Sequence, residues 1–210
     1  DRASAAEALA GALHAGLGAA LAAHGRATLV VSGGTTPAPM FRLLRDKPLA
    51  WNRIDVLASD ERDVPPDHAD RNEGMIRREL LQGAAAVARL IPLIPPGPVP
   101  RHFDEVVLGM GADGHTASLF PGDPLADESE RWVGWTDGAH ASPPVPRVSL
   151  TLPALSAARK TVFVVSGEAK GRVVRDIEEG SERSRQYPAA RVRCAGSTSW
   201  YVAAEDAPVS

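Results

Sequence analysis

The spacing of apolar residues along the chain predicts alternating helices and strands. Leu9, Leu13, Leu17 and Leu21 recur every four residues, which indicates one face of an amphipathic helix that ends at Gly25. Short apolar runs typical of buried strands come after it, and helices are expected between them. The strand runs are 27–31, 54–59, 104–110 and 160–167, and the helices are expected from Pro37, over 72–81 and over 167–180.

Other segments carry less regular patterns. RVSLTL at 147–152 is a strand candidate followed by a helical turn at Pro153, and ARVRC at 190–194 and SWYVAAEDA at 199–207 are two further strand candidates. DERDVPPDHAD at 60–70 has the composition of a polar loop. IPLIPPGPVPR at 91–101 has too many prolines for a helix or a central strand, so we expect a surface connection there.

Short apolar strands that alternate with helices indicate an α/β fold, a parallel sheet with helices on both faces. The alternation resumes after the proline-rich segment, so we expect residues 1–210 to form a single domain. In such sheets ligands bind beyond the carboxyl ends of the strands. We therefore expect the functional residues in the loops that follow the predicted strands.

Composition narrows the class of protein. The chain has 210 residues with 23 Lys and Arg against 26 Asp and Glu, a net charge of −3, so we expect no nucleic-acid partner. No apolar run approaches about 18 residues without interruption. The first residues also lack the basic start and apolar run of a signal peptide, so we expect no membrane association. The single cysteine, Cys194, cannot form an internal disulfide and fits the reducing cytoplasm.

Two of the loops after strands have residues suited to binding an anion. SGGTTP at 32–37 places two glycines and two threonines at the start of a helix, where backbone amides favour negative charge. The alternative for this segment alone is a tight strand-to-helix turn. Lys170 is the last residue of SGEAK at 166–170 and lies in the first turn of the expected helix. There its ammonium could join those amides around a phosphate, although a lone lysine is generally only solvated.

The loop GMGADGHTASLFPG at 109–122 is the strongest candidate for catalysis. Asp113 and His115 flank Gly114, so the carboxylate could orient the imidazole, which is the natural base for taking a proton from water near neutral pH. The DER triplet at 60–62 could equally be a surface salt bridge. The six histidines show no paired spacing typical of metal ligands, so no metal site is expected.

Taken together, these segments resemble the glucosamine-6-phosphate isomerase/6-phosphogluconolactonase family. The resemblance runs in the expected order through SGGTTP, ASDER with DRNEGMIRREL, VVLGMGADGHTASLFPG, RVSLTLPAL and FVVSGEAKGRVV. The TASLFPG end of the third block is more similar to the lactonase branch than to the deaminase branch. The resemblance implies a Rossmann-like α/β fold and hydrolysis of 6-phosphogluconolactone to 6-phosphogluconate, a step of the oxidative pentose phosphate pathway, without a cofactor.

The resemblance also implies roles for individual residues. The expected catalytic residues are a base that activates water, its neighbouring carboxylate and the outer two residues of the DER triplet: His115, Asp113, Asp60 and Arg62. The residues expected to bind the substrate or its phosphate are Gly33, Gly34, Thr35, Lys170, Asn72 and Arg147. The expected partner is a small sugar-phosphate lactone.

Two alternatives stay open on the sequence. An aldose–ketose isomerase or deaminase that acts on amino-sugar phosphates would share the fold and the Asp–His loop, with Asp60 as a possible carbon base. A non-catalytic sugar-phosphate sensor would use the same loops only to bind its ligand. The absence of a helix-turn-helix pattern or a basic segment in the sequence argues against a stand-alone regulator.

Overall fold

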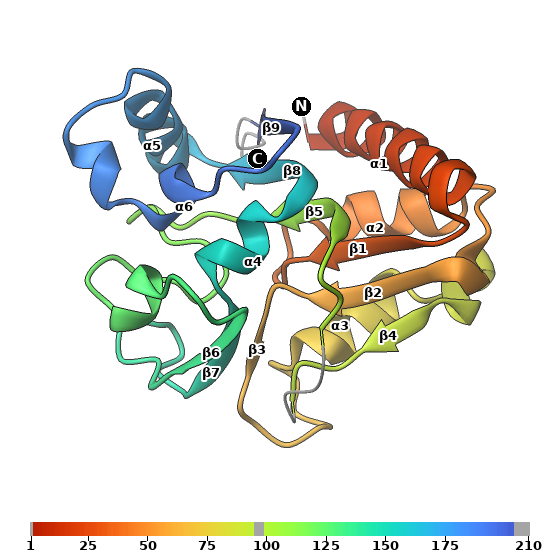
Figure 1. Ribbon diagram of the computed structural model, residues 1–210, viewed down its shortest axis with the longest axis horizontal. Coiled ribbons are helices and arrows are strands. Elements are labelled where there is room, and N and C mark those ends of the chain that lie inside the picture. The colour runs from red at the N-terminus through yellow and green to blue at the C-terminus, as the bar shows by residue number, and fades with distance from the viewer. Residues whose placement is uncertain (1, 95–98, 204–210) are drawn as a thin grey trace, which may run out of the picture.

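The computed structural model describes residues 2–94 and 99–203 and contains the predicted parallel sheet. Its six strands, each parallel to its neighbours, lie in the order β4-β2-β1-β5-β8-β9 (Figure 1). The strand bounds are β1 Ala27–Val31, β2 Ile54–Ala58, β4 Arg89–Ile91, β5 Phe103–Leu108, β8 Ala158–Ser166 and β9 Ser197–Ala203. Every residue of β2 and β5 is buried, which is typical of strands covered on both faces.

The helices fill the intervals between the strands. The α-helices are α1 Arg2–His24, α2 Ala38–Arg45, α3 Asn72–Glu79, α4 Leu152–Ser156, α5 Glu168–Glu178 and α6 Pro188–Arg191. Short 3₁₀ turns occupy Trp51–Arg53, Gly83–Val87, Pro124–Asp127 and Arg183–Gln186. In Figure 1, α1 runs beside α2 over the sheet, and α5 and α6 lie toward the other end of the molecule. The predicted α/β fold is confirmed.

A second, smaller sheet was not expected from the sequence. It is antiparallel, in the order β3-β7-β6, and consists of β3 Asp60–Arg62, β6 Val133–Thr136 and β7 Arg147–Leu150. The prediction of a loop from residue 60 was therefore wrong for its first three residues. The chain leaves β2 at Ser59, whose carbonyl accepts the Leu150 N–H at 2.8 Å, so β7 crosses the end of β2 and pairs with β3.

Three other expectations need correction. The strand predicted at 190–194 is wrong, because α6 occupies Pro188–Arg191 and the Ala189 N–H donates to Gly114 rather than to a sheet. The strand predicted at 199–207 is β9, which starts earlier, and residues 204–207 lie outside the described residues. Ile91, in the proline-rich segment, belongs to the edge strand β4, and residues 95–98 of that segment also lie outside the described part.

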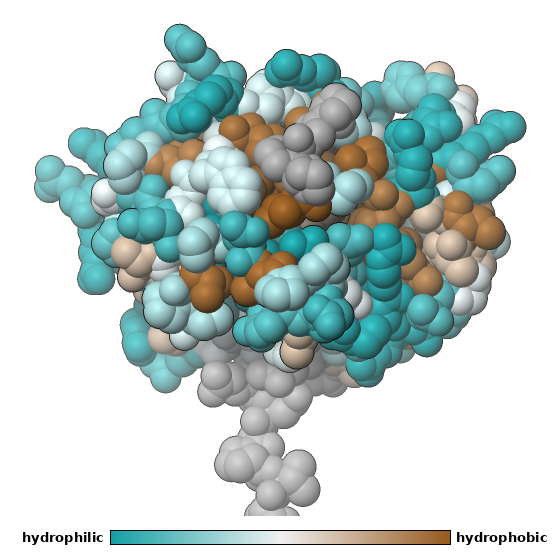
Figure 2. Space-filling model, turned by 90° about the horizontal axis from the view of Figure 1, so that it is seen from below, coloured by the Kyte–Doolittle hydropathy of each residue, from teal (hydrophilic) through white to brown (hydrophobic). Residues whose placement is uncertain are grey.

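The leucine stripe of α1 packs into the core, as its spacing predicts. Leu9, Leu13 and Leu17 are buried, and α1 contacts β1, β5 and β9. Among the described residues, four large apolar side chains are exposed: Leu43, Val87, Trp135 and Val202. On the face shown in Figure 2, hydrophilic residues surround a central area where hydrophobic side chains reach the surface.

Within the described residues, α1 is also the one helix long and apolar enough to cross a membrane by length and composition. A core helix of a soluble protein passes the same test. In α1 the leucine stripe of Leu9, Leu13 and Leu17 is buried against the sheet.

Glu105 is an acidic residue in the apolar layer between β5 and α1. It is only 3% exposed, and its carboxyl group lies against Gly16, where a Cβ atom would overlap it. Burial raises the pKa of Glu105 to about 7; the nearby Asp104 charge acts in the same direction, and Lys160 and Arg159 oppose it. The folded protein therefore holds this proton at a pH where the unfolded chain has lost it.

We expect the free energy of unfolding to carry a pH dependence that comes from Glu105. Its contribution is fully present below about pH 4.5 and is lost as the pH rises through about 7, a change of about 3 kcal/mol. Glu105→Gln removes this titration. Urea unfolding at pH 5 and pH 8 should show the variant gaining stability relative to the unaltered protein at the higher pH. A difference between the two proteins that stays constant over this range would contradict the assignment.

Candidate active site

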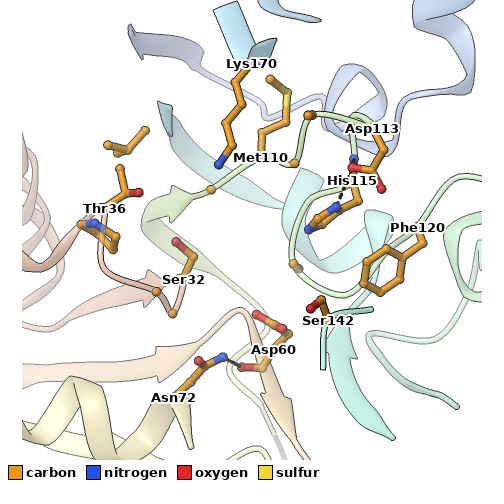
Figure 3. Close-up of a pocket in the computed structure, with 18 of the residues that line it drawn as sticks. Ser32, Thr36, Asp60, Asn72, Met110, Asp113, His115, Phe120, Ser142 and Lys170 are labelled. Carbon is orange, nitrogen blue, oxygen red and sulfur yellow. Dashed lines mark hydrogen bonds and ion pairs between the residues drawn. The ribbon is translucent and has the colours of Figure 1, made fainter. Parts of the chain in front are cut away.

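The loops after β1, β2, β5 and β8 meet at one edge of the sheet and line a cavity of about 580 Å³. Figure 3 shows side chains from these loops directed into it, with Lys170 on one side and His115 on the other. All ten residues that the sequence analysis selected line this cavity: Gly33, Gly34, Thr35, Asp60, Arg62, Asn72, Asp113, His115, Arg147 and Lys170.

His115 and Asp113 form a hydrogen-bonded pair at the cavity wall. His115 Nδ1 lies 2.6 Å from Asp113 Oδ1, and the His115 backbone N–H donates to the same oxygen at 3.2 Å. Burial acts to raise the pKa of Asp113, but the hydrogen bonds and charge of His115 outweigh it and lower that pKa below the usual value. Because an ionised carboxylate only accepts, Nδ1 is the donor, and Nε2 is left with a lone pair available as a base.

The tight backbone around this pair requires glycine. A Cβ atom at Gly111 would overlap both the His115 ring and the Asp113 carboxylate. The loop closes on itself through two hydrogen bonds, from the Gly111 N–H to the His115 carbonyl at 3.0 Å and from the Thr116 hydroxyl to the Gly109 carbonyl at 2.8 Å. We call residues 109–120 the His115 loop. Its geometry fixes the imidazole by local contacts.

Asn72 joins the glycine turn to the DER triplet. Its side chain donates to the Asp60 carbonyl at 2.7 Å and accepts from Arg62 Nη1 at 2.6 Å. A Cβ atom at Gly33 would overlap this side chain, so the turn after β1 can approach α3 only because residue 33 is glycine. The binding wall is therefore built from three segments that are far apart in the sequence.

Glu61, the middle residue of the triplet, has a structural role that the sequence analysis missed. Its buried carboxyl group accepts the backbone N–H groups of Arg62, Asn72 and Glu73 at 2.7–2.8 Å and so caps the start of α3. Burial raises the pKa of Glu61, against these hydrogen bonds and the nearby Arg71. Glu61 lies 11 positions before Asn72, too far for a local capping pattern, so only the fold shows the contact.

Asp60 is buried at the floor of the cavity, and hydroxyl groups bind both of its carboxylate oxygens. Ser59 donates to Oδ1 at 3.0 Å, and Ser118 of the His115 loop donates to Oδ2 at 2.7 Å. Arg147 Nη1 lies 3.8 Å from Oδ2. The carboxylate thus has three polar neighbours, and Asp60 itself is buried.

Arg147 also holds the loop that precedes its own strand. Its Nη2 donates to the carbonyls of Ser142 and Pro143 at 3.3 and 3.1 Å, which fixes the loop between β6 and β7 at the cavity mouth. Burial lowers the pKa of Arg147, the neighbouring positive charge of Arg62 adds to this effect, and Asp60 opposes it. A guanidinium group remains charged despite such a shift, so two arginines face the cavity near one buried carboxylate.

Some cavity residues were not selected from the sequence. Phe120 packs between two imidazoles, with ring centroids 4.7 Å from His115 and 6.4 Å from His140. Phe120 belongs to the TASLF run that the sequence analysis quoted, whereas His140 lies in a loop with no motif. Ser32, Thr36, Met110 and Ser142 complete the labelled part of the lining (Figure 3).

In the part of the chain that the structure describes, no group of three or more His, Cys, Asp or Glu side chains could hold a metal ion.

The sequence matches the family described as glucosamine-6-phosphate isomerases/6-phosphogluconolactonase over residues 1–98 and 83–200. The chain belongs to this family. A 6-phosphogluconolactonase of Pseudomonas aeruginosa is 38% identical over 209 residues, covering 88% of this chain and 85% of the relative. One of Caulobacter vibrioides is 38% identical over 183 residues, covering 78% and 79%. A crystal structure of a 6-phosphogluconolactonase of Shewanella baltica superposes with a TM-score of 0.83 at 30% identity over 97% of this chain and 95% of that one.

The family joins isomerases and lactonases in one description. Membership therefore fixes the fold, while the choice between the two reactions depends on the groups inside the cavity and on which members are most similar. The relatives reported above all carry the name 6-phosphogluconolactonase.

Proposed function

We propose that this protein hydrolyses 6-phosphogluconolactone to 6-phosphogluconate, the function expected from the sequence. The observation that carries the proposal is the His115–Asp113 pair, whose free imidazole nitrogen lies in the same cavity as the glycine turn and Lys170. One cavity thus offers a base for water and cationic groups for a phosphate. The lactonase relatives, which match most of the chain, support the same choice.

In the proposed reaction, His115 Nε2 removes a proton from a water molecule as its oxygen attacks C1 of the lactone. The tetrahedral intermediate carries the negative charge on the former carbonyl oxygen. When the C1–O5 bond breaks, the protonated imidazole returns its proton to O5, leaving the open-chain acid. General-base help of this kind contributes about 10²–10⁴-fold in rate.

Asp113 keeps the imidazole in the required tautomer and stabilises its protonated form. The developing oxyanion needs hydrogen-bond donors, for which Arg62 and the backbone amides of the His115 loop are the candidates. A cyclic ester is already activated, so this route requires neither a covalent serine nor a redox cofactor or metal.

The phosphate end of the substrate fits the opposite side of the cavity. Gly33, Gly34 and Thr35 lie between β1 and α2, and Lys170 extends from α5 toward this turn (Figure 3). Backbone amides and an ammonium group together favour a doubly charged phosphate. Asn72 and Arg147, at the floor and far wall, are the proposed contacts of the sugar ring.

The isomerase alternative requires a base beside C2 of an open-chain sugar. Asp60 is the candidate for it, but Ser59 and Ser118 already donate to both of its oxygens and it is 6% exposed. A carboxylate held in this way is poorly placed to remove a proton from carbon. We therefore propose that Asp60 holds Arg147 and the His115 loop in place.

The proposal includes the rest of the expectations from the sequence. The substrate is a small soluble metabolite, so the protein is proposed to work in the cytoplasm without a nucleic-acid or membrane partner. Residues 1–210 are proposed to act as one sugar-phosphate lactonase domain.

Freshly generated 6-phosphogluconolactone provides the direct test. We expect the protein to open it far faster than the uncatalysed reaction, followed as acid release at constant pH. In heavy water, glucosamine-6-phosphate should gain no deuterium at C2 and fructose-6-phosphate none at C1, since lactone hydrolysis breaks no carbon–hydrogen bond. Deuterium at either carbon together with slow lactone opening would establish the isomerase instead.

Lys170→Ala should weaken binding of the phosphorylated lactone much more than that of plain gluconolactone. Only the first substrate has the phosphate that the ammonium group is proposed to contact, so KM should rise roughly ten- to a hundredfold for it alone, the effect of losing a charge-assisted hydrogen bond. Steady-state kinetics on both substrates checks this. Equal losses on the two would remove Lys170 from the phosphate site.

His115 should be required for the reaction as its base. His115→Ala should therefore lower kcat by at least about 10²-fold, measured by steady-state kinetics on 6-phosphogluconolactone. Asp113→Asn keeps the base but weakens its orientation, so it should also lower kcat. Full activity of His115→Ala would exclude it as the base.

A further inference from the structure

Ser118 lies in the His115 loop, three residues after the histidine, yet its side chain points to a different strand end. Its hydroxyl donates to Asp60 Oδ2 at 2.7 Å across 58 positions of sequence, and the side chain is fully buried. Its backbone N–H donates to the Ser149 hydroxyl of β7 at 3.1 Å. Ser118 thus joins the loop with the base to the end of β2 and to the small sheet.

The backbone immediately before Ser118 is held in a conformation that costs free energy. Ala117 has a φ of +50°, and it is the one non-glycine residue with positive φ in the described chain. Such a residue typically costs about 1–3 kcal/mol and persists where the surrounding structure enforces it. Here the Ser118 hydrogen bonds on one side and the Thr116–Leu119 turn on the other enforce the conformation. The Ser118 hydroxyl therefore contacts Asp60 although the backbone at Ala117 has to adopt an unfavourable conformation.

Asp60 has a second hydroxyl donor, and the contrast between the two donors is informative. Ser59 and Ser118 are both fully buried, and each binds one oxygen of the same carboxylate. Ser59 is the residue next to Asp60, so its hydrogen bond joins nothing that the backbone does not already join. Of the two hydroxyl groups, only that of Ser118 joins the His115 loop to the wall that contains Arg62, Asn72 and Arg147, beside the backbone hydrogen bond from Ser118 to Ser149 of β7.

We propose that Ser118 is a positioning residue for the hydrolytic step, and that it acts through Asp60 to hold His115 at the working distance from the substrate-binding wall. This role rests on the function proposed above. Ser118 touches no reacting atom, because Ala117 and Phe120, not Ser118, line the cavity. A displacement of about 1 Å between a base and its substrate can lower a rate by about 10²-fold.

The test compares Ser118→Ala with Ser59→Ala, which remove one hydroxyl each from the same carboxylate. We expect kcat on 6-phosphogluconolactone to fall roughly ten- to a hundredfold in Ser118→Ala, with KM changed less than about threefold, because Lys170 and the glycine turn belong to other loops. Ser59→Ala should show a clearly smaller loss of kcat. Ser184→Ala, which removes a buried hydroxyl that donates to Ser181 at 2.7 Å outside the site, controls for loss of stability alone.

Circular dichroism and urea unfolding establish the folded fraction of each variant, and kcat is compared among folded proteins. If Ser118→Ala does not fold, Ser118→Cys and Ser59→Cys give the same comparison, since a thiol keeps the volume but is a weak donor. Equal losses of kcat in the Ser118 and Ser59 variants, or an unaltered kcat in Ser118→Ala, would overturn the positioning role. Failure of the unaltered protein to open the lactone would instead contradict the proposed function.

Discussion

The site depends on one constraint, the common direction of β2, β1, β5 and β8. Because neighbouring parallel strands all end at the same edge of the sheet, the four loops that follow them must meet there, although they are spread along the sequence from Ser32 to Lys170. Each loop brings a different group: backbone amides after β1, the DER triplet after β2, the imidazole after β5 and an ammonium group after β8. The imidazole and the groups proposed to bind the phosphate therefore come from different loops.

Buried polar contacts then fix the loops relative to one another. Asp60 accepts from Ser59 and Ser118, Glu61 caps α3, and Asn72 connects Arg62 to the Asp60 backbone. Buried polar groups are costly unless each has a partner. A displacement of the His115 loop or of the segment after β2 would leave several of these groups without partners, so the network favours a single arrangement of this part of the cavity wall.

The charges in the cavity separate its two ends. Asp113 lies beside the imidazole, where a negative charge stabilises the protonated ring formed in the proposed reaction. Lys170 lies across the cavity, close to the glycine turn and away from that carboxylate (Figure 3). Arg62 and Arg147 also line the cavity, and Asp60 is the buried carboxylate beside Arg147. The arrangement places negative charge where a proton is handled and positive charge where a phosphate is proposed to bind.

The sequence by itself determined the parallel sheet and most helix and strand positions, since apolar periodicity is a local signal. The ten candidate residues came from the loops after the predicted strands together with the resemblance to the family. The tertiary structure alone decided the antiparallel sheet, the helical turn at Pro188–Arg191 and the capping by Glu61. It also decided that Ser118 binds Asp60 and that His140 lies at the cavity. These features depend on contacts between residues far apart in the chain, and such contacts leave no periodic pattern in the sequence.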